Sequence, residues 1–124
     1  MSTQSPLARV EGLGSARSGT AHFWRQRVTA VALIPLSLWF FCAALALVGA
    51  DRQLVVAFLH QPINAIAMAL FVVASLHHSM LGLQVVIEDY VHSEIWKVIF
   101  LLLNQLVGWS LGTASLFALV RMAL

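Results

Sequence analysis

The sequence contains few charged residues. Seven Lys and Arg and five Asp and Glu make up 10% of its 124 residues, whereas 60% of the chain is hydrophobic. Soluble domains carry about 25% charged residues, so this composition excludes an ordinary soluble domain. With a mean hydropathy of +0.89, the sequence predicts a membrane protein, too short for a separate soluble domain. The basic residues are scattered between apolar runs, which argues against nucleic-acid binding despite the net charge of +2.

Cysteine is almost absent. Cys42 is the one cysteine and lies inside an apolar run, which excludes an internal disulfide and a metal site made of cysteines alone. Residues 1–21 contain no short apolar core followed by a small-residue cleavage site. We therefore expect a flexible polar tail there, not a cleaved secretory signal.

Three apolar segments without charge follow within residues 22–124. They cover about residues 28–48, 63–87 and 98–120, and each is near the ~20 residues that a membrane crossing needs. The sequence thus predicts an all-α bundle of three transmembrane helices joined by short connectors, about 49–62 and 88–97. Pro35 should kink the first helix, and Pro62 suits the first turn of the second.

Basic residues near the ends of the spans predict their orientation. Five of them precede the first span or follow the second, and two lie on the opposite side. The five are Arg9, Arg17, Arg25, Arg27 and Lys97, and the two are Arg52 and Arg121. Because cytoplasmic loops are enriched in Lys and Arg, we expect a cytoplasmic N-terminus and an outward C-terminus.

The third apolar segment has small and polar residues along one face. Asn104, Gly108, Gly112 and Ser115 share this face, and the Gly-x-x-x-Gly pair permits close approach of another helix. Two alternatives follow: the face packs within this chain, or it receives a helix of a partner subunit.

Two adjacent histidines in the second span are the strongest functional signal. Ionisable groups in hydrocarbon are costly and usually mark a cofactor, a proton path or a partner. His78 shares a helix face with Gly82, Val85 and Asp89. Eleven residues of helix are roughly 16 Å long, so His78 lies near the middle of a ~30 Å hydrocarbon core if Asp89 lies at its surface.

A neutral imidazole beside a glycine recess can ligate the iron of a porphyrin. Gly82 supplies such a recess one turn from His78, whereas the face of His77 carries no glycine, so we favour His78. The two side chains point about 100° apart and cannot bind opposite sides of one iron. A partner chain would then donate the second ligand, or one position is open. The simpler alternative is a histidine that only hydrogen-bonds to a neighbouring helix.

Two polar groups flank the spans on the predicted cytoplasmic side. Tyr90 can donate a hydrogen bond to a carbonyl oxygen at the interface, and Asp89 can orient it or pass a proton. Arg27 could meet an acidic group inside the bundle, such as a haem propionate. The alternatives are an ordinary interfacial tyrosine and an ordinary basic flank.

The residues of the second span resemble a known family. The pattern His78-x-x-x-Gly82-x-x-x-x-x-x-Asp89-Tyr90-Val91 resembles the second-helix signature of the small hydrophobic membrane-anchor subunit of succinate dehydrogenase. The resemblance is to the D type of alphaproteobacteria and mitochondria. Arg27-x-Thr29-Ala30 also resembles the family, and the resemblance covers about residues 20–122.

This resemblance implies a role in a complex. His78 would be one axial ligand of haem b, with Gly82 beside it, and a second three-helix anchor subunit would give the other. Tyr90 and Asp89 would bind ubiquinone, and Arg27 would approach the haem propionates. A flavoprotein subunit would oxidise succinate and an iron–sulfur subunit would relay the electrons, so this chain would hold no catalytic residue for succinate oxidation. The expected location is the bacterial inner membrane, with the mitochondrial inner membrane second.

Three other functions are alternatives to this one. A small multidrug transporter has a similar length but normally crosses four times and uses a membrane-embedded acidic residue, and no Asp or Glu lies inside these spans. An anchor of fumarate reductase would work in the opposite direction. A purely structural anchor would contact neither haem nor quinone.

Overall fold

A computed structural model of the chain describes residues 16–124, and side chains from residue 20 onward. The described part contains four helices and no strand: α2 (Ala16–Ala46), α3 (Arg52–Leu59), α4 (Pro62–Tyr90) and α5 (Glu94–Ala123). The predicted all-α fold is therefore confirmed. Of the predicted polar tail, residues 1–15 lie outside the described residues and residues 16–21 belong to α2.

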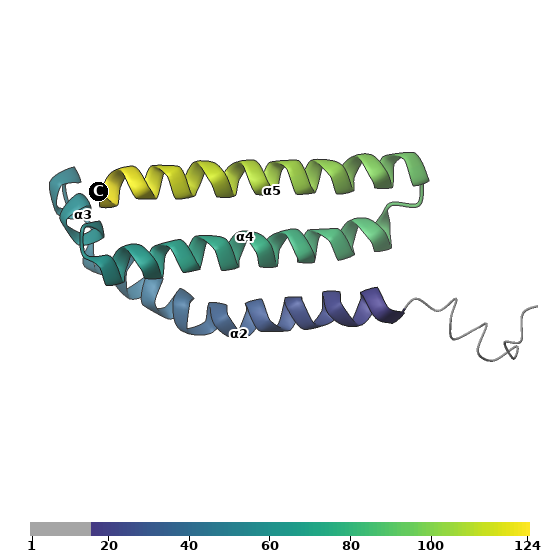
Figure 1. Cartoon of the computed structure of the whole chain (residues 1–124), viewed down its shortest axis with the longest axis horizontal. Helices are drawn as coiled ribbons and strands as arrows, with labels where there is room; N and C mark the ends of the chain where they lie inside the picture. The colour runs from purple at the N-terminus through teal and green to yellow at the C-terminus, as the bar shows by residue number, and fades with distance from the viewer. Residues whose placement is uncertain (1–15) are drawn as a thin grey trace, which may run out of the picture.

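Helix α4 occupies the middle of the bundle. It packs against α2 on one side and α5 on the other, and over the described residues the backbones of α2 and α5 do not come close to each other. The start of α2 and the turn between α4 and α5 lie at one end of the bundle, whereas α3 and the C-terminus lie at the other (Figure 1). Three long helices, Thr20–Ala46, Pro62–Tyr90 and Glu94–Ala123, are long and apolar enough to cross a membrane. The N-terminal side and the second connector share one end, as predicted, and which end faces the cytoplasm stays a prediction.

The first connector is more ordered than the sequence suggested. It holds the short helix α3, which begins where the Asp51 side chain accepts a hydrogen bond of 2.9 Å from the backbone N–H of Leu54. Such an N-cap satisfies one of the free N–H groups of a helix start. Gly49, with φ of 77°, turns the chain out of α2, a conformation that glycine adopts without steric cost. Pro62 begins α4, where its missing N–H costs nothing.

Pro35 lies inside α2 without ending it. The helix is continuous from Ala16 to Ala46, and Figure 1 shows it bending in its C-terminal half. A proline removes one backbone hydrogen bond and crowds the preceding turn, which is a common cause of such a bend. The bend carries the end of α2 toward α3.

Helices α4 and α5 are joined along the face of small residues predicted on the third span. Asn104 donates a hydrogen bond of 2.9 Å from Nδ2 to the backbone oxygen of Met80. Gly108 is buried, and the Met80 side chain fills the space where a Cβ would stand. At Gly112 a Cβ would meet Leu76 Cδ1 at 3.5 Å. This face therefore packs within the chain, which decides between the two alternatives.

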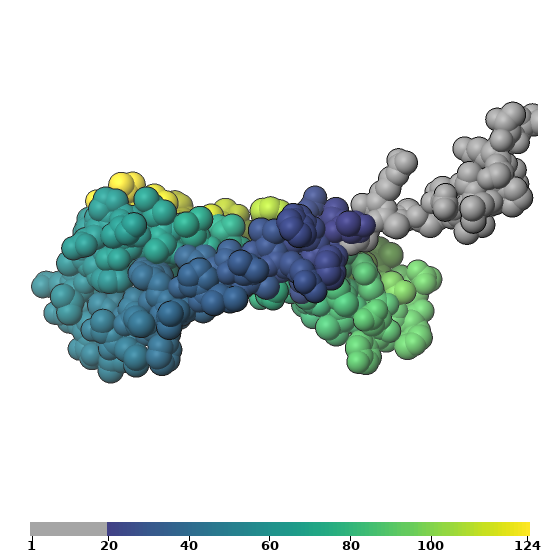
Figure 2. All heavy atoms as spheres, turned by 90° about the horizontal axis from the view of Figure 1, so that it is seen from below, coloured from purple at the N-terminus to yellow at the C-terminus, as the bar shows by residue number. Residues whose placement is uncertain are grey.

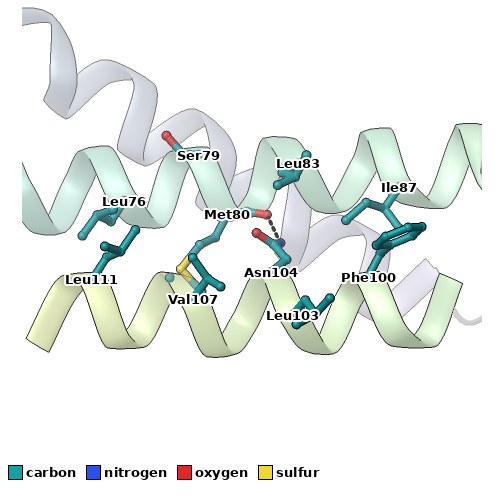
Figure 3. A pocket seen from close by; sticks show the side chains of 11 residues that line it. Leu76, Ser79, Met80, Leu83, Ile87, Phe100, Leu103, Asn104, Val107 and Leu111 are labelled. Atoms are coloured by element: carbon teal, nitrogen blue, oxygen red, sulfur yellow. Dashed lines mark hydrogen bonds between the residues drawn. The ribbon is translucent and has the colours of Figure 1, made fainter. Parts of the chain in front are cut away.

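A shallow groove runs beside this contact (Figure 3). Its volume is about 410 Å³, and it extends from Leu76 and Leu111 at one end to Ile87 and Phe100 at the other. The Asn104–Met80 hydrogen bond crosses its floor. Apart from Ser79 and Asn104, the side chains that line it are apolar.

The bundle has a very small core. In the part of the chain that the structure describes, the buried hydrophobic residues are Ala43, Leu59, Leu81, Ile87 and Leu119. Large apolar side chains are exposed along every long helix. The molecule is also narrower along the middle of α2 than at its ends (Figure 2). Such a surface suits contact with lipid or with other membrane helices, not with water.

The tight contact at Gly108 yields a prediction. Gly108→Val should place branched carbons onto Met80 and force α4 and α5 apart, at a cost of about 1–3 kcal/mol. Gly112→Ala is the matched control, because its new methyl group meets Leu76 at ordinary contact distance. Thermal denaturation of the protein purified in detergent should show a lower midpoint for the first variant alone. Equal midpoints for the two variants would contradict the packing described here.

Candidate functional site

His78 faces α2, not α5. Its Nδ1 atom lies 3.0 Å from the hydroxyl oxygen of Thr29, a contact that joins the two helices. Both side chains are half-buried. Thr29 is held in turn by its own helix, because its hydroxyl lies 2.9 Å from the backbone oxygens of Arg25 and of Gln26. The predicted ligand thus lies in a seam between two helices, with one ring nitrogen engaged.

Gly82 lies in the same seam, one turn from His78. A Cβ at this position would meet Gln26 Nε2 at 3.6 Å and no other side chain or distant backbone within 4 Å. The glycine thus leaves a shallow recess whose one close neighbour is the end of a flexible glutamine side chain. The structure therefore brings His78 and Gly82 together against Thr29 and Gln26.

His77 lies on the other side of α4. It lines a cavity of about 150 Å³ between α4 and α5, together with Trp109, Gly112 and Thr113. No hydrogen bond to His77 occurs among the described residues, and Thr113 gives its hydroxyl proton to the backbone oxygen of Trp109 at 2.8 Å. The divergence of the two histidines agrees with the helix geometry, and it gives them different neighbouring helices.

Sequence reasoning missed the polar face of α2. His22, Gln26 and Thr29 follow at i, i+4 and i+7 and so share a helix face. Within the described residues, His22 Nε2 and Gln26 Oε1 are buried without a hydrogen-bond partner. This spacing was the signal that could have identified the face. From the sequence, Thr29 stands out only as part of the motif Arg27-x-Thr29-Ala30.

Arg27 points away from this seam. It is exposed, and its guanidinium lies 4.6 Å from the centre of the Phe23 ring, a cation–π contact within α2. Arg27 forms no ion pair among the described side chains, where the ion pair found is that of Lys97 with Glu94, at 3.7 Å. Within this chain the structure therefore does not bring Arg27 to His78.

Asp89 and Tyr90 close α4 at the end of the bundle where α2 begins. Both are exposed, and Tyr90 has 76% of its surface accessible. Among the described residues neither side chain makes a hydrogen bond, whereas the Glu88 side chain accepts one of 2.8 Å from Gln84 Nε2. The phenol and the carboxylate are thus free to meet a ligand or another subunit.

The site can offer a metal one imidazole, not a complete coordination shell. No group of three or more His, Cys, Asp or Glu side chains that could hold an ion occurs among the described residues. A single imidazole suits a porphyrin, which brings four nitrogen ligands of its own. The bundle and this seam define a membrane-embedded helical protein with a polar site open to partners.

Comparison with known proteins identifies the family. The family described as "Succinate dehydrogenase/Fumarate reductase transmembrane subunit" matches residues 1–119. A succinate dehydrogenase hydrophobic membrane anchor subunit of Paracoccus denitrificans is 33% identical over 120 residues, 97% of this chain and 92% of that protein. The protein of the same name from Rickettsia bellii is 41% identical over 88 residues, 71% of this chain and 70% of that one. No solved structure matches the chain. The chain belongs to the family of succinate dehydrogenase membrane anchor subunits.

The open surroundings of Gly82 lead to a second prediction. Gly82→Ala should leave the α2–α4 contact intact, because the new methyl group meets only Gln26 at van der Waals distance. Alanine also favours a helix interior over glycine by about 0.5–1 kcal/mol. The purified complex should melt at the wild-type temperature or slightly above it. A clear fall in the melting temperature would mean that the seam is tighter than described.

Proposed function

We propose that this chain anchors a succinate:ubiquinone oxidoreductase and contributes to both its haem site and its quinone site. His78 serves as one axial ligand of haem b, and Tyr90 with Asp89 forms part of the ubiquinone site. Membership of the anchor family supports the role in the complex. The observation that carries the haem assignment is the position of His78 in the seam between α2 and α4. There Thr29 is hydrogen-bonded to Nδ1 of the ring, and Nε2 has no hydrogen bond among the described residues.

The residues present fit a haem. Nδ1 of His78 is engaged by Thr29, and no hydrogen bond reaches Nε2 among the described residues. Nε2 can therefore bind iron, the common mode for a histidine whose other nitrogen is hydrogen-bonded. Gly82 leaves room one turn away. The buried atoms His22 Nε2 and Gln26 Oε1 lack partners in the described part of the chain, as expected of a seam that is completed by another group.

Each residue then has a defined task. Haem b, when bound, supplies a one-electron redox centre. His78 holds it near the membrane midplane, since eleven residues, roughly 16 Å of helix, separate His78 from Asp89 at the surface. Gly82 keeps a bulky side chain out of the space beside the ring. Arg27 pairs with the propionates, for which its guanidinium would leave its present contact with Phe23.

The quinone site lies at the end of α4. The phenol of Tyr90 donates a hydrogen bond to a quinone carbonyl oxygen, which favours the build-up of negative charge there. Asp89 orients the phenol or passes a proton from the aqueous side. The exposure of both side chains supports this assignment, because a quinone and a neighbouring subunit can reach them.

The proposed setting is a four-subunit complex in the bacterial inner membrane. The flavoprotein oxidises succinate, the iron–sulfur subunit relays electrons, and a second three-helix anchor supplies the other haem ligand. The basic residues at the start of α2 and at Lys97 favour a cytoplasmic location for that end of the bundle. The family description also covers fumarate reductase, but the relatives named above are succinate dehydrogenase anchors, which favours succinate oxidation.

The haem assignment is tested by comparing two alanine variants of the complex. His78→Ala should abolish or shift the haem b band in a dithionite-reduced minus oxidised spectrum, because the iron loses this ligand. His77→Ala is the matched control, since it removes the adjacent imidazole from the other side of α4. It should leave the band in place. If the band survives in His78→Ala and vanishes in His77→Ala, the ligand has been misassigned.

The quinone assignment is tested separately. Tyr90→Phe removes one hydroxyl and no packing, since the side chain is exposed. Loss of one hydrogen bond to a developing charge should lower succinate–ubiquinone reductase activity at least about tenfold. Succinate oxidation with a soluble artificial acceptor, which bypasses the membrane site, should stay unchanged. An equal fall in both activities would indicate damaged assembly in place of a lost contact with quinone.

A further inference from the structure

We infer that Thr29 is a positioning residue for the imidazole of His78. Its hydroxyl oxygen accepts a hydrogen bond from Nδ1–H, holds the ring in one orientation and keeps the lone pair of Nε2 free for iron. The inference rests on the proposed haem ligation and adds to it a residue on a different helix. The observation behind it is the 3.0 Å contact between Thr29 Oγ1 and His78 Nδ1.

The acceptors around the Thr29 hydroxyl support a hydrogen bond that runs from His78 to Thr29. A threonine hydroxyl has one proton to donate and two lone pairs to accept with. Two backbone oxygens, those of Arg25 and Gln26, lie 2.9 Å from Oγ1 and can take that proton. With the proton given to one of these carbonyls, the oxygen keeps a lone pair for His78, and we assign the imidazole as the donor, with its proton on Nδ1. In a neutral imidazole this leaves Nε2 unprotonated.

The membrane makes this acceptor necessary. If Nε2 binds iron, Nδ1 must carry the proton, and an N–H group without a partner is costly in hydrocarbon. Among the residues that the structure describes, Thr29 makes the hydrogen bond to this ring and no carboxylate is bonded to it. A back-bonded threonine on α2 is also a fixed acceptor, because its side chain is tied to its own helix.

Loss of the acceptor should change the iron, and not only the packing. When Nδ1–H of a histidine donates a hydrogen bond, the ligating Nε2 becomes more basic, which favours ferric over ferrous iron. Its removal should therefore move the midpoint potential of the haem to a more positive value. We expect a change of up to about tenfold in the ferric-to-ferrous preference, about 59 mV for a one-electron couple, and a lower ratio of haem to protein.

The experiment compares hydroxyl-bearing and hydroxyl-free variants in the assembled complex. Thr29→Val keeps the shape and removes the acceptor, whereas Thr29→Ser keeps the acceptor. Thr113→Val is the matched control, because Thr113 also donates to its own helix but is not bonded to a histidine. Two quantities are measured: the midpoint potential of the haem, by redox titration of its band, and the largest g value of the oxidised haem. Thr29→Val should shift both, and Thr29→Ser and Thr113→Val should match wild type.

The outcomes separate this inference from the haem assignment. An unshifted potential in Thr29→Val, with the band lost in His78→Ala, would overturn the role of Thr29 alone. Equal shifts in Thr29→Val and Thr29→Ser would also overturn it, since packing would then explain both. If His78→Ala keeps an unchanged haem, the proposed ligation itself fails. Should Thr29→Val not assemble, the smaller Thr29→Ala is compared with Thr29→Ser by the same criteria.

Discussion

Hydrocarbon offers no hydrogen bonds, and this constraint governs the polar side chains of the bundle. Several of them are satisfied by a backbone carbonyl of the same chain. Asn64 donates to Phe58 at 3.0 Å, Thr113 donates to Trp109 at 2.8 Å, and Asn104 crosses from α5 to the backbone of Met80. Each such bond removes a polar group from contact with lipid. The side chains that find no such bond are then the ones that need another explanation.

Two groups of histidine and glutamine side chains among them lie on opposite sides of α4. On one side, His78 meets Thr29 in a seam where His22 and Gln26 also bury atoms without a partner in the described chain. On the other, His77 lines a small cavity against α5. Helix α2 covers the first of these faces and α5 the second, so each histidine meets a different neighbouring helix. A bundle of this form has little core of its own, and packing with other membrane helices is its natural completion.

Much of the architecture could be predicted from the sequence, because a run of about twenty apolar residues has one stable form in hydrocarbon. The small residues at Gly108 and Gly112 marked a helix contact, but their spacing could not say which helix fills it. Met80, on α4, decided that question only in the structure. The helix α3 was missed, since Asp51 and Arg52 were interpreted as loop residues although Asp51 is an N-cap.

The candidate site was harder to predict, because its hydrogen bonds join helices far apart in the sequence. His78 and Thr29 are separated by 49 positions, and no local periodicity connects them. Arg27, in contrast, stood out by its charge, yet it lies on a different face of α2 from the one that meets α4.

The choice between the adjacent histidines illustrates why the second helix matters. Spacing to Gly82 and Asp89 favoured His78, but the two imidazoles are chemically equal on α4 alone. What distinguishes them is the neighbour that each ring meets. An imidazole that binds iron through Nε2 needs an acceptor for the proton on Nδ1. His78 has one in Thr29, whereas no hydrogen bond to His77 is formed in the described part of the chain. The preference for His78 thus depends as much on α2 as on the helix that carries it.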